Sequence, residues 1–385
     1  MKILVVVPNT NWGGITTSIT NFSNEMVEEG HQLVFLDMSG LYKCGDNLSD
    51  RIYRGHLSGK ARYWNLGKET LKKSHGLKKV LLSALGVVKK IAIRLGLWYS
   101  LVFNKYKEYG EFDVAIAFRQ CASCYSFVLG KVKAKKKLGF VHGELRHMGD
   151  ISSWRKYLTK FNKVAYVSEV IKEGFVAAYP ELADNAVTIY NMLDTARIEK
   201  MAEQKNPCEF DRCRFNIITV TRVENTLKCV DRIPHICDRL KKLNAPDFHW
   251  YVVGDGPDFD ATVRLARSLD VTDVLTFTGA TENPFCILKD ADICVQTSKT
   301  EAYSMVLIES LFLNVPIFAA RYPSLGEILK DGENGIVCEQ DNRDIADKLL
   351  AAMRGEIDIQ KMKSALQKSK KTNEKQYLQF LNAIG

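Results

Sequence analysis

The chain has 385 residues and a formal net charge of +9, with 46% hydrophobic and 26% charged residues. This length suits two domains of roughly 150–200 residues, and the composition is typical of a globular fold with sizeable cores. Ten cysteines are too sparse in such a chain for a disulfide scaffold. The apolar run Met1–Pro8 is too short for a secretory signal, and no run of about eighteen apolar residues predicts a transmembrane helix. We therefore expect a cytoplasmic protein.

The N-terminal part, residues 1–195, is predicted to be one α/β domain. The apolar run Ile3–Val7 predicts a buried strand, and a glycine turn at Asn9–Gly14 and an amphipathic helix at Thr16–Glu29 follow it. Further strands are predicted at Leu33–Leu36, Val114–Phe118, Lys137–Val141 and Val164–Val167. Strands that alternate with helix-length segments favour a doubly wound, Rossmann-like sheet.

A second α/β domain is predicted at residues 213–360. The pattern loosens between Tyr190 and Cys213, where we place the linker. Strands are then predicted at Phe215–Val220, Trp250–Val253, Val274–Phe277, Ile293–Gln296, Val315–Ala319 and Gly335–Cys338. Residues 361–385 are predicted to form a C-terminal helix that packs back on the N-terminal domain.

The segment from Glu301 to Glu309 carries the strongest sign of chemistry. It follows the predicted strand Ile293–Gln296, and ligands of open α/β sheets bind beyond the carboxyl ends of the strands. Glu301 lies in a polar turn, and Glu309 lies about two turns along the predicted helix Met305–Leu313. A helix N-terminal acid is the alternative explanation for Glu301. That explanation does not account for Glu309, an acid on an otherwise apolar helix face.

The start of this helix is a candidate anion site. The backbone N–H groups of Tyr303, Ser304 and Met305 would point at a bound phosphate, because the N-terminal turn of a helix has unpaired donors. One carboxylate could then reach sugar hydroxyls and the other ribose hydroxyls.

Arg222 and Lys228 follow the predicted strand that ends at Val220. An arginine and a lysine at a strand end can clamp a pyrophosphate, the arginine by its planar fork and the lysine as a point charge. By themselves, the two residues are better explained as solvated surface cations.

Two further candidates lie in the N-terminal domain. Paired glycines in Asn11-Trp12-Gly13-Gly14 would let the backbone approach a ligand closely at a helix N-terminus, although a turn that merely needs glycine is the alternative. His142 follows the strand Lys137–Val141 and could hydrogen-bond a substrate hydroxyl or a developing charge. A structural histidine is the alternative there.

Metal binding is not predicted. Cys121 and Cys124 form an isolated C-x-x-C, for which a redox or zinc role is open, but no second pair supports zinc. Asp258-Phe-Asp260 and Asp290-Ala-Asp292 have the DxD spacing of metal-dependent glycosyltransferases of another fold. Their positions beside a glycine loop and before a strand favour capping or turn roles. We expect no cofactor.

In their order and spacing, these segments resemble the retaining glycosyltransferases of family 4, including bacterial capsular and exopolysaccharide enzymes. The resemblance implies the GT-B fold, with two Rossmann-like domains facing across a cleft. Its most specific part is the E-x7-E pair Glu301 and Glu309, followed by Ser310–Pro316, which matches the family's "EAxAxGxPV" run. Weaker matches are Val253–Pro257, Phe277–Gly279, Asn191–Asp194, Glu327–Ile328 and Gly332–Gly335.

Four positions depart from the family pattern. Thr221 stands where a glycine commonly precedes the clamp arginine, and Cys229 replaces the usual glycine after the lysine. Ala302 follows the first glutamate, and Asn314 precedes Val-Pro, where the family often has glycine. Each departure could shift a loop, but none removes a charged group.

The resemblance implies a hexosyltransferase that uses a nucleotide-diphosphate sugar, commonly a uridine nucleotide. Arg222, Lys228 and the helix starting near Met305 would hold the pyrophosphate. Glu301 would contact the donor sugar and Glu309 the ribose. His142 and the Gly13-Gly14 turn would complete the sugar site from the facing domain. Retention would proceed by attack on the face from which the leaving group departs, and the leaving phosphate would accept the acceptor's proton.

The stretch His75–Phe103 combines apolar residues with many lysines, among them Lys78, Lys79, Lys89 and Lys90. A basic amphipathic helix over Leu77–Phe103 would suit an anionic membrane surface, and a core helix with a solvated lysine face is an equal alternative. The membrane interpretation implies a peripheral enzyme on the inner face of the cell membrane. Its acceptor would be a lipid-linked saccharide in envelope polysaccharide assembly.

Two other functions stay open at this point. A nucleotide-sugar 2-epimerase shares the GT-B fold, but it needs further acid/base carboxylates that the sequence does not reveal. A non-catalytic sugar-nucleotide-binding partner is disfavoured by the complete set of charged residues. Nucleic-acid binding is not expected, because the basic residues are not interleaved with stacking aromatics.

Overall fold

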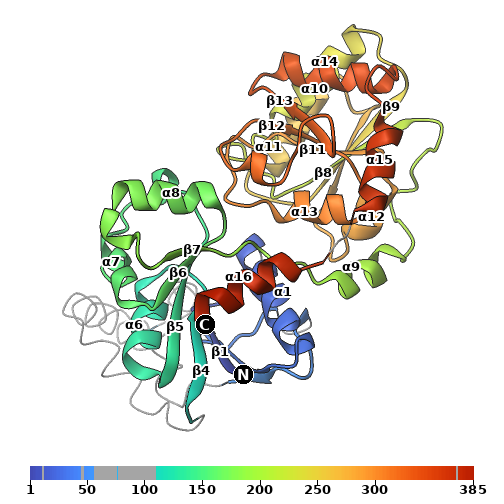
Figure 1. Ribbon diagram of the computed structural model, residues 1–385. Helices are drawn as coiled ribbons and strands as arrows, with labels where there is room; N and C mark the ends of the chain where they lie inside the picture. Colours follow the sequence, from blue (N-terminus) through green and yellow to red (C-terminus); the bar gives the residue numbers. More distant parts are fainter. Residues whose placement is uncertain (11–12, 45–46, 56–75, 77–109, 370–371) are drawn as a thin grey trace. The chain divides into compact units, whose positions relative to one another are not determined.

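A computed structural model describes residues 1–10, 13–44, 47–55, 76, 110–369 and 372–385. The chain forms two compact units (Figure 1). Unit 1 comprises Met1–Met192 together with Glu374–Gly385, and unit 2 comprises Leu193–Asn373. Each unit is built on its own parallel sheet and is described by itself below.

Across its described residues, unit 1 contains one seven-stranded parallel sheet in the order β3-β2-β1-β4-β5-β6-β7. The strands are β1 (Lys2–Val7), β2 (Gln32–Asp37), β3 (Tyr53–Arg54), β4 (Phe112–Ala117), β5 (Ala134–Val141), β6 (Lys163–Tyr166) and β7 (Ala186–Thr188). The run Ile3–Val7 is almost fully buried, as expected for a strand covered on both faces. The edge strands β3 and β7 were not predicted, because they are short, partly exposed and lack an apolar run.

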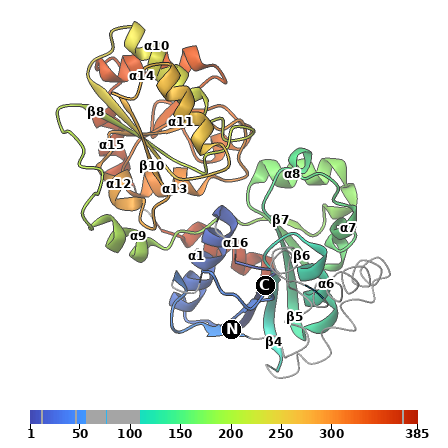
Figure 2. The same cartoon turned by 180° about the vertical axis from the view of Figure 1, so that it is seen from behind.

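The described helices of unit 1 are α1 (Gly14–Glu28), α6 (Ala122–Lys131), α7 (Ser152–Arg155), α8 (Glu169–Ala178) and α16 (Glu374–Ile384). Short 3-10 turns lie at Leu145–His147, Leu158–Lys160 and Pro180–Leu182. Helix α16 lies beside α1 in both views (Figure 1 and Figure 2). Phe380 of α16 is fully buried and meets the Phe22 ring of α1 edge-on, with ring centroids 5.3 Å apart. This contact makes α16 part of the core of unit 1.

Unit 2 has a six-stranded parallel sheet in the order β10-β9-β8-β11-β12-β13. Its strands are β8 (Phe215–Val220), β9 (Phe248–Val253), β10 (Leu275–Gly279), β11 (Ile293–Gln296), β12 (Ile317–Ala320) and β13 (Gly335–Cys338). Its helices are α9 (Thr195–Ala202), α10 (Arg232–Lys242), α11 (Phe259–Ser268), α12 (Phe285–Asp290), α13 (Met305–Phe312), α14 (Asn342–Met353) and α15 (Ile359–Lys368), with a 3-10 turn at Leu325–Glu327.

Helices cover both faces of this sheet. Ile217 belongs to a core with residues of α10, α11, α14 and α15, whereas its neighbour Ile218 packs into a second core with α12. Phe318 and Ile317 of β12 divide in the same way, and Ile317 packs with Leu307 of α13. The period-two alternation of a strand therefore divides neighbouring residues between the two faces.

In each sheet, the direction in which successive strands are added reverses at one pair of neighbouring strands. In unit 1 the chain runs outward from β1 through β2 and β3, then returns to place β4 on the other side of β1. In unit 2 the same relation holds between β8 and β11. The loops after these strand pairs define the crevice where open α/β sheets bind ligands.

Two predicted boundaries differ from the structure. The linker expected between Tyr190 and Cys213 contains helix α9, which begins at an Asp194 cap and buries Ile198 and Ala202 against Phe285 of unit 2. Residues 361–385 hold two helices rather than one. Helix α15 belongs to unit 2 and α16 to unit 1.

Within the described ranges, no helix combines the length and apolarity needed to cross a bilayer. The basic segment Leu77–Phe103 lies outside the described residues.

Candidate functional site

Lys228 and Glu301 meet at the switch point of unit 2. Lys228 lies in the loop after β8 and Glu301 in the loop after β11, and these two strands are neighbours in the sheet. The Lys228 Nζ atom is 2.5 Å from Glu301 Oε1, and the two side chains are 29% and 12% exposed. Two residues that the sequence placed at separate strand ends are therefore in contact.

Glu301 is held by neutral donors as well. Its Oε1 atom accepts hydrogen bonds from Ser298 Oγ at 2.8 Å and from Gln296 Nε2 at 3.2 Å. Ser324 Oγ donates to the Glu301 backbone carbonyl at 2.7 Å. The carboxylate is thereby fixed in one orientation, which a site that recognises a ligand by direction requires.

Gln296 links this carboxylate to the start of α13. Its amide donates to Ser304 Oγ at 2.9 Å, and its Oε1 accepts from the Tyr322 hydroxyl at 3.1 Å. Gln296, Ser298, Tyr322 and Ser324 were not among the predicted site residues. The position of Gln296 at the end of a predicted buried strand was the available signal, since a polar side chain there is unusual unless it is hydrogen-bonded.

The two loops are also joined through their backbones. Thr297 Oγ1 donates to the Lys228 carbonyl at 2.9 Å, and the Lys299 N–H donates to the Leu227 carbonyl at 2.8 Å. These bonds do not depend on the side-chain ion pair. The loops would therefore stay together when the ion pair is broken.

Arg222 lies near this pair in sequence but is not bonded to it. Its side chain is exposed, and within the described part of the chain its guanidinium makes no hydrogen bond or ion pair. Its backbone is held tightly, because the Thr221 N–H donates to the Val253 carbonyl at 2.9 Å and the Val223 N–H to the Asp255 carbonyl at 3.1 Å. The loop is thus fixed while the arginine fork remains accessible.

Two glycines permit this arrangement. A Cβ atom at Gly254, which has φ +140°, would lie 1.8 Å from the Thr221 carbonyl oxygen, and one at Gly256 would lie 2.2 Å from that of Val223. Both distances are far below van der Waals contact. The glycines of the Val253–Pro257 segment therefore let the Arg222 loop pack against the loop after β9.

The first turn of α13 follows Glu301 directly. Ser304 is the N-cap and is buried, but its side chain bonds Gln296 instead of capping the helix. Met305 is buried, and Tyr303 packs at the edge of a core cluster. The first N–H groups of the helix have no intrahelical acceptor, so they supply the positive end that an anion requires.

Glu309 is buried in the second turn of α13. Burial raises its pKa to about 7, and the positive charge of Arg197 opposes that rise. Among the described residues, no ion pair or hydrogen bond joins its carboxyl to Lys228 or Glu301. Arg197 lies on α9, inside the segment interpreted as a linker, which is why the sequence did not reveal it as a neighbour.

This pKa predicts a particular pH dependence of stability. The ordinary glutamate value is 4.5, so between pH 4.5 and about 7 the unfolded chain ionises at Glu309 while the folded protein does not. The free energy of unfolding should therefore fall as pH rises through this window, by on the order of 3 kcal/mol in total. Comparing urea unfolding at pH 5 and pH 8 for the wild type and Glu309→Gln should show that the variant lacks this loss. Glu356→Gln, on the surface of the same unit, should retain it.

Equal pH dependence in the wild type and Glu309→Gln would show that the buried carboxyl does not change its pKa on folding. Denaturant slopes that agree among the three proteins would confirm that the same unfolding transition is compared.

Two of the residues that stand where the family pattern has glycine, Cys229 and Asn314, have a backbone conformation that glycine adopts easily. Cys229 has φ +51° and Asn314 has φ +63°, both in the left-handed region. Asparagine tolerates this region well, and Asn314 follows the end of α13, where glycine or asparagine commonly terminates a helix. Cys229 has no such compensation and carries backbone strain.

Replacing Cys229 by glycine is therefore expected to stabilise the protein by about 1 kcal/mol, because glycine adopts this conformation without steric cost. Chemical denaturation would measure the difference. Cys229→Ala keeps a Cβ atom and should show no comparable gain. A loss of stability in Cys229→Gly would mean that cysteine packing outweighs the strain.

The remaining predicted residues lie in unit 1. Gly13 has φ +145° and precedes α1, which begins at Gly14, while Asn11 and Trp12 lie outside the described residues. The Thr16 and Thr17 N–H groups donate to the Gly13 carbonyl at 2.9 and 3.1 Å. Among the described residues other than the chain neighbours, no heavy atom lies within 4 Å of a Cβ atom built at Gly13 or Gly14.

His142 is buried after β5. Its Nε2 lies 2.7 Å from the Phe118 carbonyl oxygen, and a carbonyl only accepts, so Nε2 carries the proton. Burial lowers the pKa of His142 to about 4, and its ring stacks on Phe140. The imidazole is therefore neutral at neutral pH, and its Nδ1 is an acceptor.

The aspartate pairs have structural partners. Asp258 Oδ2 accepts from the Asn225 N–H and Asp292 Oδ2 from the Asn216 N–H, both at 2.8 Å. Asp290 bonds Asn206 and pairs with Arg212. In the described part of the chain, no cluster of three or more His, Cys, Asp or Glu side chains has the arrangement of a metal site.

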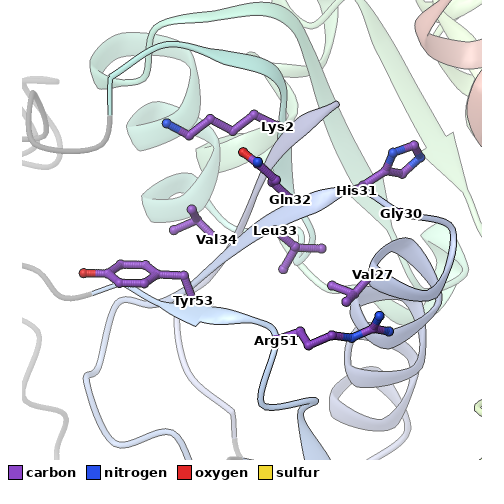
Figure 3. Close-up of a pocket in the computed structure, with 9 residues that line it drawn as sticks. All are labelled: Lys2, Val27, Gly30, His31, Gln32, Leu33, Val34, Arg51 and Tyr53. Carbon is purple, nitrogen blue, oxygen red and sulfur yellow. The ribbon is translucent and has the colours of Figure 1, made fainter.

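A pocket of about 720 Å³ lies elsewhere in unit 1 (Figure 3). Its lining includes Lys2 and Gln32, the first residues of β1 and β2, together with His31, Arg51 and Tyr53. It thus lies at the amino ends of the strands, opposite the edge where such sheets bind ligands. None of the predicted site residues lines it.

The chain is similar to known glycosyltransferases. Residues 201–372 match the model of the family described as glycosyl transferases group 1. The N-acetyl-alpha-D-glucosaminyl L-malate synthase of Bacillus anthracis is 26% identical over 171 residues, which cover 44% of this chain and 44% of that relative. The match therefore spans less than half the length of this relative.

Solved structures resemble the chain over its whole length. A mutant of S. aureus TarM in complex with fondaparinux, alpha-GlcNAc-glycerol and UDP has a TM-score of 0.70 at 16% identity, covering 100% of this chain and 99% of that chain. The apo form of the lipopolysaccharide outer core galactosyltransferase WaaB has a TM-score of 0.65 at 17% identity, covering 100% and 99%. These likenesses confirm the predicted fold class of two parallel-sheet α/β domains of the GT-B type. Together with the family match, they support a transferase enzyme.

Proposed function

We propose that the protein is a retaining glycosyltransferase of family 4, because residues 201–372 match the model of the family described as glycosyl transferases group 1. It moves a sugar from a nucleotide-diphosphate sugar to a saccharide acceptor. The observation that carries this proposal is the Lys228–Glu301 pair at the β8–β11 switch point. An ion pair here presents a cation and an oriented carboxylate in the crevice where the fold binds its ligand.

The donor's diphosphate binds to three groups of unit 2. Arg222 offers an exposed and unpaired guanidinium fork, and Lys228 offers a point charge. The free N–H groups at the start of α13 add the positive end of a helix dipole. All three stabilise negative charge, which grows on the leaving phosphate as the sugar bond breaks.

Glu301 recognises the sugar and Glu309 the ribose. When the phosphate draws Lys228 toward itself, Glu301 stays in place through Ser298 and Gln296 and can accept hydrogen bonds from sugar hydroxyls. Because these neutral donors hold the carboxylate, its orientation does not depend on its ion pair with Lys228. We assign the Gly13-Gly14 turn and the Nδ1 acceptor of His142, both in unit 1, to sugar recognition as well.

Transfer exchanges one bond for another. The acceptor hydroxyl oxygen bonds the anomeric carbon on the face from which the phosphate departs, and the bond between that carbon and the phosphate oxygen breaks. The hydroxyl proton passes to the leaving phosphate. His142 is neutral at neutral pH and so takes part as a hydrogen-bond acceptor rather than as a cation.

Two of the similar structures support a proposal for the donor nucleotide and the acceptor. UDP is bound to the TarM mutant, and WaaB is named as an enzyme of the lipopolysaccharide outer core. We extend these properties to this chain as a uridine-nucleotide donor and a saccharide acceptor, lipid-linked, in cell-envelope polysaccharide synthesis. Peripheral attachment to an anionic membrane surface through Leu77–Phe103 belongs to the same proposal.

Thermal-shift measurements with a panel of nucleotide-diphosphate sugars test the donor assignment. A ligand at a hundred times its Kd stabilises the native state by about 2.7 kcal/mol, so the true donor should raise the Tm clearly. Arg222→Ala should melt like the wild type without ligand, because the side chain is exposed and unpaired, but should lose most of the ligand-induced rise. Arg267→Ala, an exposed arginine on α11, should keep that rise. The absence of a shift with every nucleotide sugar, together with no transfer product, would overturn the proposal.

A further inference from the structure

Cys121 and Cys124 lie at the start of α6, on the carboxyl side of β4. Cys121 is the N-cap of the helix, and Cys124 lies in its first turn. The Cys124 N–H donates to Cys121 Sγ at 3.5 Å, and Ser123 Oγ lies 3.1 Å from the same sulfur. The Cys121 sulfur is thus the capping acceptor of the helix.

The two cysteines lie three residues apart at the same helix start and differ in environment. Cys124 is completely buried, with the Val6 carbonyl 3.7 Å from its sulfur, whereas Cys121 is partly exposed. A partly exposed cysteine at a helix start, three residues before a buried one, is the arrangement in which a C-x-x-C pair exchanges disulfides.

The charges around the pair favour the same division of roles. The hydrogen bond from Cys124 is the largest cause that lowers the pKa of Cys121, to about 6, and the nearby Arg119 lowers it further. Burial raises the pKa of Cys124 well above its usual value, and the carboxylate of Asp37 adds to that effect. Cys121 is therefore the attacking thiolate and Cys124 the resolving thiol.

We propose that Cys121 and Cys124 form a reversible dithiol modification site that exchanges with small-molecule disulfides. This goes beyond the proposed sugar transfer and does not depend on it. The Cys121 thiolate attacks one sulfur of the small disulfide, forms a mixed disulfide and releases one thiolate, which takes up a proton. Cys124 then loses its proton and attacks the Cys121 sulfur, which releases the second small thiol. Overall, two cysteine thiols and one disulfide yield one protein disulfide and two small thiols.

The site adjoins the predicted ligand edge of unit 1. Between the pair and β4, Gln120 Oε1 accepts from the His142 N–H at 3.2 Å, and the Arg119 guanidinium donates to Asn9 at 3.0 Å. Closing the disulfide would join the Cys121 and Cys124 side chains covalently beside this loop, whose Gln120 is bonded to His142.

Two measurements on the full chain test the proposal. After equilibration with oxidised glutathione and acid quenching, the tryptic peptide of residues 120–131, which contains both cysteines, should be lighter by two hydrogen atoms, and dithiothreitol should restore its mass. In the reduced protein, the rate of Cys121 alkylation by iodoacetamide should level off near pH 7. At pH 6 it should exceed that of free cysteine by about tenfold, because the larger thiolate fraction outweighs the lower nucleophilicity.

Single variants distinguish the roles of the two thiols. Cys124→Ser should accumulate glutathione on Cys121 as a mixed disulfide, and Cys121→Ser should form neither product at these positions. Melting curves of both reduced variants would confirm that they are folded. The proposal is overturned if the wild-type peptide keeps both hydrogen atoms, if folded Cys124→Ser takes up no glutathione at Cys121, or if the alkylation rate keeps rising above pH 8.

Discussion

Glu301→Gln is expected to lower the turnover number of sugar transfer about 100-fold or more, because the carboxylate's contribution grows as the sugar–phosphate bond breaks. The fold should survive the change. Lys228, Gln296 and Ser298 all donate to Oε1, an acceptor that the glutamine amide retains. Steady-state kinetics with the donor identified by thermal shift would measure the effect, and a melting curve would verify folding.

Asp347→Asn is a matched control for the loss of one carboxylate charge. It breaks the Arg239–Asp347 ion pair, 2.9 Å long, between α10 and α14 of the same unit. Exposed pairs of this kind contribute about 0–1 kcal/mol, so both stability and turnover should be nearly unchanged. If Glu301→Gln is folded and turns over as fast as this control, the role assigned to Glu301 is wrong.

Gly254→Ala is expected to destabilise the protein by about 3 kcal/mol or more. The added methyl would lie 1.8 Å from the Thr221 carbonyl oxygen, and the residue would have to keep φ +140°, which L-residues rarely adopt. The Arg222 loop must move to relieve the clash, so donor binding should weaken in any molecules that remain folded. Thermal melting with and without the donor would measure both effects.

Gly326→Ala provides the comparison within unit 2, since a Cβ atom there would meet no heavy atom within 4 Å. It should melt close to the wild type. Equal melting temperatures for the two alanine variants would show that the loops after β8 and β9 can separate at little cost.

The sequence was sufficient to predict the buried strands and insufficient for the short, more exposed ones. β8, β11 and the edge strand β13 have the predicted bounds, because a strand covered on both faces leaves a mostly apolar run. β7 has three partly buried residues and leaves no such run. Helix α9 was interpreted as linker because Asn191 and Asp194 look like breakers, whereas Asp194 is the cap that starts the helix.

The contacts of the candidate site were likewise only partly predictable from the sequence. The contact between Lys228 and Glu301 could be predicted, because each residue follows a central strand and parallel strands end at one edge of the sheet. The hydrogen-bond network that orients Glu301 could not be predicted, since Tyr322 bonds Gln296 from 26 residues further along the chain. The tautomer of His142 depends on the Phe118 carbonyl, which only the β4–β5 register brings to it.

The chain passes from unit 1 to unit 2 at Leu193 and returns to unit 1 after Asn373. Asn373 is hydrogen-bonded to Leu193, so the two connecting segments are joined. Its side chain accepts from the Leu193 N–H at 2.9 Å and donates to the Leu193 carbonyl at 2.8 Å. Unit 2 is therefore an insertion in unit 1, whose core lacks Phe380 until α16 has been synthesised. Until then Phe22 lacks the Phe380 ring, although its contacts with the rings of Phe118 and Phe140 can already form. The core of unit 1 is therefore completed only after the whole of unit 2 has been synthesised.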